Sequence, residues 1–116
     1  MSDAPPPDDA LALLGDEYAR AILIATTTEP MTAPTVAAEI DAAESTVYDR
    51  IADLQDAGFL TEVTRTDDDG NHYAEYRARL ERLAVRVTPD GFEATVDYAD
   101  RDEAAERLRA LWRDVK

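Results

Sequence analysis

The chain has 116 residues, the size of one ordinary domain, and can bury a hydrophobic core without disulfides or structural metals. It has no cysteine and one histidine, which excludes a disulfide framework, a thiolate or multi-histidine metal site and a cysteine nucleophile. The net charge is −14, from 26 acidic and 12 basic residues. No apolar run approaches the roughly 20 residues of a membrane span, and the first residues lack a secretion signal. We therefore expect a cytoplasmic location and no membrane partner.

The first 30 residues predict a tail and two helical segments. Residues 1–7 are rich in proline and are expected to form a disordered tail. Asp8 or Asp9 is expected to cap the first helix. Gly15 then interrupts the pattern, so we expect a kink and a second segment over 16–27. One apolar face recurs at steps of three and four residues: Leu11, Leu14, Tyr18, Ile22 and Ala25.

Two more helices are expected before Gly58. Thr32 has the side chain of an N-cap, which predicts a short helix over 33–40. After a turn at 41–43, a longer helix is expected over 44–57, and Gly58 follows where a left-handed C-cap favours glycine. Its core face is defined by spacings of four and three residues: Val47, Ile51 and Leu54.

Two hairpins and a last helix complete the predicted elements. Asp69-Gly70 predicts a two-residue loop that pairs Thr66 with Tyr73 and Glu62 with Arg77, and puts Val63 on one face with Ala74 and Tyr76. A second hairpin over 83–98 turns at Pro-Asp-Gly, with one apolar face: Leu83, Val85, Val87, Phe92, Ala94, Val96 and Tyr98. A helix over 100–116 begins with capping-box spacing and carries an apolar stripe: Ala104, Leu108, Leu111, Trp112 and Val115.

This order of elements predicts an α+β winged helix-turn-helix, a three-helix core with a hairpin wing, followed by a C-terminal hairpin and helix. The expected division is a tail (1–7), a DNA-binding domain (8–80) and a C-terminal part (81–116). The stretch "STVYDRIADLQDAGFL" at 45–60 resembles the ArsR and PadR-like group of prokaryotic transcriptional regulators. Their usual pattern is S-T-V-Y/S-x-x-I/L-x-x-L-x-x-A-G-L/F-L/V. The resemblance implies a DNA-binding regulator and covers residues 10–80. Asp49 departs from it, because many relatives have a basic or neutral residue there.

The DNA contacts are expected from the first turns of the helix over 44–57, because the N-terminal part of a recognition helix reaches the bases. Arg50 could read guanine, and hydroxyls could bond to bases or phosphates. Arginines in the hairpin wing are expected to reach phosphates, although Arg77 could instead pair with Glu62. The full set of predicted DNA-contacting residues is Thr35, Ser45, Thr46, Tyr48, Asp49, Arg50, Arg65, His72 and Arg77.

Dimerisation is expected through the first and last helices, because such regulators usually bind two-fold sites. The predicted residues are Leu11, Leu14, Tyr18, Leu108, Leu111, Trp112 and Val115. The alternative is that the C-terminal stripe packs on the protein's own first helix. No Ser/His/Asp order, Gly-rich phosphate loop or metal cluster occurs, so we expect neither an enzyme nor a cofactor.

The charge composition bears on the partner. Eleven of the twelve bases are arginine, and Asp (16) outnumbers Glu (10). Acidic proteins with few lysines resemble those of salt-in halophiles, notably haloarchaea. An ordinary acidic protein, or one that binds basic partners, is the other interpretation. We therefore expect a halophilic regulator that binds double-stranded DNA with K+ or other cations at its acidic surface. The alternatives are a winged-helix module that binds a protein of the transcription machinery, and an acidic DNA mimic.

Overall fold

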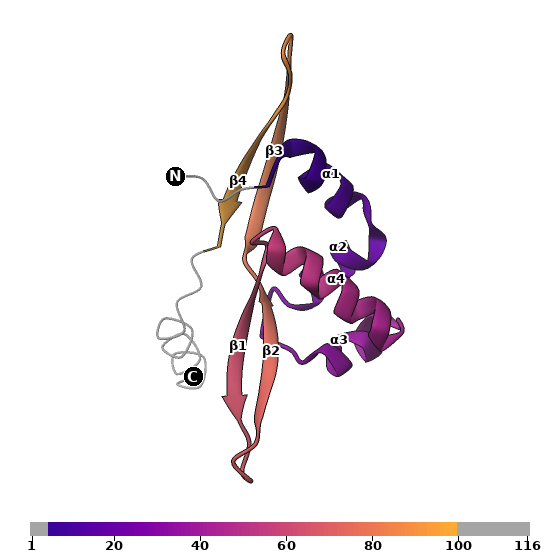
Figure 1. Ribbon diagram of the computed structural model, residues 1–116, viewed down its shortest axis with the longest axis vertical. Helices are drawn as coiled ribbons and strands as arrows, with labels where there is room; N and C mark the ends of the chain where they lie inside the picture. Colours follow the sequence, from indigo (N-terminus) through magenta and orange to yellow (C-terminus); the bar gives the residue numbers. More distant parts are fainter. Residues whose placement is uncertain (1–4, 100–116) are drawn as a thin grey trace, which may run out of the picture.

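The computed structural model describes residues 5–99, which form four helices and two antiparallel hairpins (Figure 1). This confirms the predicted α+β winged helix-turn-helix fold, while the predicted last helix lies outside the described residues. The elements are α1 (Pro7–Gly15), α2 (Glu17–Ala25), α3 (Ala33–Ile40), α4 (Glu44–Asp56), β1 (Leu60–Thr66), β2 (His72–Ala78), β3 (Leu80–Thr88) and β4 (Gly91–Tyr98).

The break between the first two helices lies where Gly15 predicts it. Asp16 adopts an extended conformation and caps α2, because its carboxylate accepts a hydrogen bond of 2.8 Å from the Ala19 amide. The predicted cap of α1 is wrong. Pro6 holds the cap position without a side-chain bond, and Asp8 and Asp9 lie in the first turn, where carboxylates interact favourably with the helix dipole.

The helix-turn-helix itself follows the sequence closely. Thr32 caps α3 by accepting a hydrogen bond of 3.3 Å from the Thr35 amide, as its side chain predicts. Asp41 then takes a left-handed conformation (φ 55°), which turns the chain toward α4. Gly58 ends α4 with a φ of 79°, and the Phe59 amide donates back to the Leu54 carbonyl at 2.9 Å. The predicted boundaries of both helices are therefore right to within one residue.

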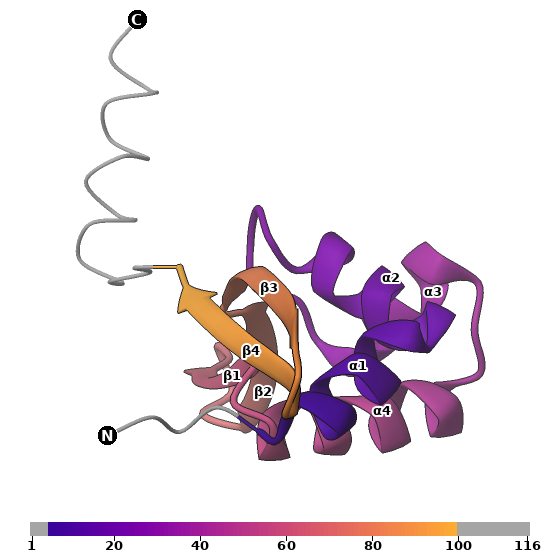
Figure 2. The ribbon, with the colours of Figure 1, turned by 90° about the horizontal axis from the view of Figure 1, so that it is seen from above.

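The core lies between the helices and the start of the first hairpin. The predicted core face of α4 is confirmed, since Val47, Ile51 and Leu54 are almost fully buried. Ile22 of α2 and Phe59 are also fully buried, and Leu60 and Tyr76 cover the core from the hairpin. Seen from above, the helices gather on one side of the two hairpins (Figure 2). This packing holds α4 at the surface beside β1.

The register of the first hairpin differs from the prediction by one residue. Thr66 pairs with His72 rather than Tyr73, and Arg77 faces Thr61 rather than Glu62. The loop is longer than Asp69-Gly70 because the Asp67 carboxylate accepts hydrogen bonds of 2.9 Å from the Asp69 and Asn71 amides. The slip moves Val63 to the opposite face from Ala74 and Tyr76, since side chains alternate along a strand.

The second hairpin forms where the alternating apolar residues and the Pro-Asp-Gly turn predict it. Val87 faces Phe92, Val85 faces Ala94 and Leu83 faces Val96, so these residues share one apolar face. The opposite face is polar and includes an ion pair of 3.2 Å between Arg82 and Asp97. Arg79 alone joins β2 to β3. The two hairpins therefore follow one another along the long axis and point in opposite directions (Figure 1).

Candidate nucleic-acid interface

The exposed face of α4 is the centre of the candidate interface. Burial of Val47, Ile51 and Leu54 turns the opposite side of the helix outward. The predicted contact residues on the first turns are thereby at the surface: Ser45, Tyr48 and Asp49 are exposed, and Thr46 is half-buried. A helix that presents its N-terminal side chains in this way has the geometry that enters a major groove.

The two flanks of α4 face different parts of the molecule. On one flank, Gln55 donates a hydrogen bond of 3.4 Å to Glu62 of β1. Tyr48 lies on the same flank, near Tyr76, whose pKa is raised by burial and further by Glu62 and Tyr48. This flank therefore faces the wing. The other flank, which carries Arg50, faces α1 and α2.

Arg50 reaches back to the break between α1 and α2. Its Nε donates to Asp16 Oδ2 at 2.9 Å, and both side chains are about one-third exposed or less. Partial burial disfavours the charged Asp16, but the Ala19 amide and the Arg50 guanidinium outweigh it and hold the Asp16 pKa below its ordinary value. The same bond to Asp16 raises the Arg50 pKa. One carboxylate thus caps α2 and ties α4 to it.

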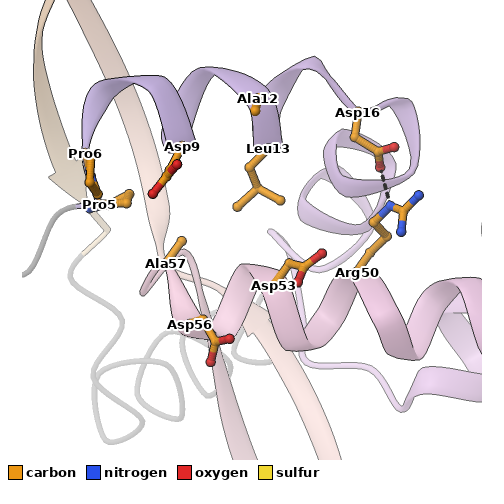
Figure 3. Close-up of a pocket in the computed structure, with 10 residues that line it drawn as sticks. All are labelled: Pro5, Pro6, Asp9, Ala12, Leu13, Asp16, Arg50, Asp53, Asp56 and Ala57. Atoms are coloured by element: carbon orange, nitrogen blue, oxygen red, sulfur yellow. Dashed lines mark hydrogen bonds and ion pairs between the residues drawn. The ribbon is translucent and has the colours of Figure 1, made fainter.

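A groove of about 550 Å³ lies between α1 and α4 on this flank (Figure 3). Its lining combines small apolar residues with carboxylates: Pro5, Pro6, Asp9, Ala12, Leu13, Asp16, Arg50, Asp53, Asp56 and Ala57. Asp53 and Asp56 line the groove, so these later acids of α4 lie toward α1. Glu44 and Asp49 are the acids of α4 that accompany Ser45 at the exposed first turns.

The predicted arginines of the wing have partners inside the protein. Arg65 Nε donates to Glu75 Oε1 on the neighbouring strand at 2.9 Å. Arg77 is only 8% exposed, and its Nη2 donates to the Thr28 carbonyl at 3.3 Å. Arg77 therefore anchors the wing to the loop after α2, while Arg65 remains half-exposed on its surface.

The remaining predicted contact residues lie on α3 and in the wing. Thr35 is exposed in the first turn of α3, and its hydroxyl accepts a hydrogen bond of 2.9 Å from Thr32. His72 is exposed near the tip of the wing, where its Nδ1 lies 3.1 Å from the Thr66 hydroxyl.

The predicted dimer residues are only partly described. Leu11 is exposed on α1 (37%), whereas Leu14 and Tyr18 are half-buried. The C-terminal members of this set, Leu108, Leu111, Trp112 and Val115, lie outside the described residues. None of the helices formed by residues 5–99 is long and apolar enough to cross a membrane.

The sequence did not reveal the hydrogen-bond partners of Arg50 and Arg77. Asp16 and Arg50 are 34 positions apart, and Arg77 and Thr28 are 49 apart. No spacing rule links residues so far apart in the chain. The one available signal was the capping position of Asp16 after Gly15, which places a carboxylate at the surface between two helices.

The family comparison agrees with this geometry. Residues 14–63, from the end of α1 into β1, match the family model described as a helix-turn-helix domain. No curated protein matches the chain. The match covers the helices that bury the core and the helix that presents Ser45, Tyr48 and Asp49 outward. Together with the fold, it supports a helix-turn-helix domain of the DNA-binding kind in residues 14–63 of this chain.

Proposed function

We propose that this protein is a sequence-specific DNA-binding transcriptional regulator that works at high salt in the cytoplasm. The exposed first turns of α4 carry the proposal, because they stand beside a wing in a chain that matches a helix-turn-helix family. In this proposal Ser45, Thr46 and Tyr48 contact the major groove. Thr35, His72 and Arg65 contact the flanking backbone.

Two of the sequence-predicted contacts receive another role in the proposal. Arg50 is bonded to Asp16, so we assign it to holding α4 in place rather than to reading a base. Arg77 is buried, so we assign it to anchoring the wing. Asp49 remains at the interface, where its charge opposes phosphate and makes cations part of the binding reaction.

The acidic surface supports the high-salt part of the proposal. At about 1 M salt the Debye length falls to about 3 Å, so repulsion between an acid on α4 and a phosphate further away is largely screened. Cations such as K+ would then lie between the acidic surface and DNA. Binding as a homodimer to a two-fold site is part of the same proposal, with the archaeal ArsR-like regulators as the group it resembles.

A second candidate is a winged-helix module that binds a protein of the transcription machinery. The specific observation in its favour is that the three predicted arginines are all bonded within the chain: Arg50 to Asp16, Arg65 to Glu75 and Arg77 to Thr28. The exposed face of α4 is left acidic. Such a face would suit a basic protein partner better than a polyanion.

Genome-wide occupancy of the tagged full chain in its own host separates the two candidates. The regulator predicts discrete sites that share a two-fold sequence, and the purified protein should shift duplexes carrying that sequence at molar KCl. Occupancy that follows the transcription machinery without a shared sequence would favour the interaction module.

A further inference from the structure

The outer half of the second hairpin presents an apolar face that no described element covers. Near the base, Leu83 and Val96 pack against the core. Toward the tip the exposed fraction rises: Val85 is 40% exposed, Phe92 51% and Val87 76%. Figure 1 shows the tip of this hairpin extending beyond the described helices. The exposed apolar residues belong to one face, because Val87 pairs with Phe92 and Val85 with Ala94.

A two-stranded hairpin is only marginally stable in water unless its apolar face packs against another element. Here the polar face has cross-strand partners of its own: Arg82 pairs with Asp97, and Arg86 faces Glu93. The apolar face of the outer half is therefore the part of the hairpin that requires a cover.

We infer that residues 108–115 of the same chain cover this face, through Leu108, Leu111, Trp112 and Val115. The sequence alone left the partner of this stripe open between the first helix and a second subunit. The structure adds a third surface, on the hairpin whose last strand, β4, leads into this segment.

The lengths agree with this assignment. Phe92 precedes Ala99 by seven residues, which is about 23 Å along a strand at 3.3 Å per residue. Trp112 follows Ala99 by 13 residues, which is about 20 Å for a helix at 1.5 Å per residue and more for any extended path. Residues 100–107 contain no large apolar side chain. The large apolar residues of the segment therefore begin at about the same distance from Ala99 as the exposed apolar residues of the hairpin.

Charge and connectivity favour the same chain over a second copy. Residues 100–116 contain five bases and five acids, so the segment is neutral and residues 1–99 carry the whole net charge of −14. The neutral segment therefore adds no like charge to the acidic body. Because it is tethered, it is present at an effective concentration in the millimolar range, which a second copy in dilute solution does not reach.

Trp112 is the sole tryptophan of the chain and reports directly on this contact. In the full-length protein we expect its emission to be blue-shifted and protected from acrylamide. Val87→Glu should shift the emission to the red and increase quenching, because it puts a charge into the covered face. Thr95→Glu is the matched control, since Thr95 is exposed on the polar face of the same hairpin. An emission maximum in the wild type like that of free tryptophan would overturn the inference.

Cross-linking keeps the test decisive if Val87→Glu does not fold. The chain has no cysteine, so Val87→Cys with Leu111→Cys supplies the only two thiols for a short bis-maleimide. We expect a cross-linked monomer, and none for Thr95→Cys with Leu111→Cys. A cross-linked dimer as the main product would assign the face to a second copy and contradict the inference, as would the absence of a cross-link.

Discussion

Arg50 and Asp16 show how one contact can set the position of α4. Asp16 caps α2 through the Ala19 amide and pairs with Arg50 of α4 through the same oxygen, Oδ2. The carboxylate thus fixes the start of α2 relative to the middle of α4. A shift of α4 would move every side chain on its exposed face, so we treat Arg50 as a positioning residue.

Asp16→Asn should remove the ion pair and keep the helix cap, because asparagine is also a good N-cap. At pH 7 we expect a loss of less than about 1 kcal/mol, the usual range for an exposed pair. Asp16→Ala should cost about 1 kcal/mol more, because the cap is lost as well. Urea unfolding of the wild type and both variants measures the two steps.

The stability difference between the wild type and Asp16→Asn should depend on pH. The Asp16 pKa is lowered in the folded protein, so its stabilisation is present above the unfolded pKa of about 3.9 and is lost as the pH falls through the lower folded value. The advantage of the wild type over Asp16→Asn should therefore be constant near neutral pH and disappear in acid. An advantage that does not decrease as the pH falls below the unfolded pKa would contradict the ion-pair account.

DNA affinity distinguishes positioning from direct reading by Arg50. If Arg50 positions α4, then Asp16→Asn and Arg50→Ala should both weaken binding to the identified site. If Arg50 reads a base, Asp16→Asn should strengthen binding, because it releases the guanidinium. Fluorescence anisotropy with a labelled duplex at fixed KCl measures both variants.

Replacing Asp49 tests how one acid on the exposed face of α4 affects DNA binding. Asp49→Asn should raise DNA affinity at about 0.1 M salt, where the Debye length is about 10 Å, and the gain should shrink toward 1 M as screening shortens it. Asp90→Asn makes the same change of charge at the tip of the second hairpin and should have little effect. Equal gains for both variants would show that only net charge matters.

At the scale of elements, the sequence predicted helices better than register. Thr32, Gly15 and Gly58 each act on the backbone next to them, so the boundaries of α2, α3 and α4 followed from local rules. The second hairpin was also predicted correctly, since Pro89-Asp90 forms its two-residue turn. In the first hairpin, the Asp67 side chain competed with the Asp69-Gly70 signal and shifted the pairing by one residue.

Asp67→Ala tests this explanation of the wing. It removes the acceptor of two backbone hydrogen bonds, each worth about 1 kcal/mol net. We expect faster hydrogen exchange for amides of β1 and β2 and little change in the helices, because the wing tip projects from the core. Asp68→Ala is the control in the same loop. Identical exchange in both variants would show that Asp67 does not hold the loop.

At the scale of the whole molecule, charge decides how the fold can be used. The location of the candidate site could be predicted from the sequence, because the spacing of Val47, Ile51 and Leu54 defines the exposed side of α4. Its electrostatics were not predictable, because the arginines of α4 and the wing find partners distant in the chain. The exposed face of α4 is therefore more acidic than a count of nearby arginines implies.

The salt dependence of DNA binding follows from that face. An ordinary binder that neutralises Z phosphates loses affinity with a slope of about −0.9Z in log K against log [salt]. Here we expect a shallow or positive slope, because cations must first screen the acids opposite the phosphates. The slope is measured from the affinity for the identified duplex across a KCl series. A steep negative slope would contradict the proposal that the protein binds DNA at high salt.

A negative charge placed on the first turns of α4 tests whether they contact DNA. Ser45→Glu is tolerated by the fold, because a carboxylate in the first turn interacts favourably with the helix dipole. Thr95→Glu adds the same charge on the polar face of the second hairpin. We predict that Ser45→Glu abolishes specific binding at molar KCl while Thr95→Glu binds like the wild type. Equal affinity of all three proteins for the duplex would contradict the proposed contact.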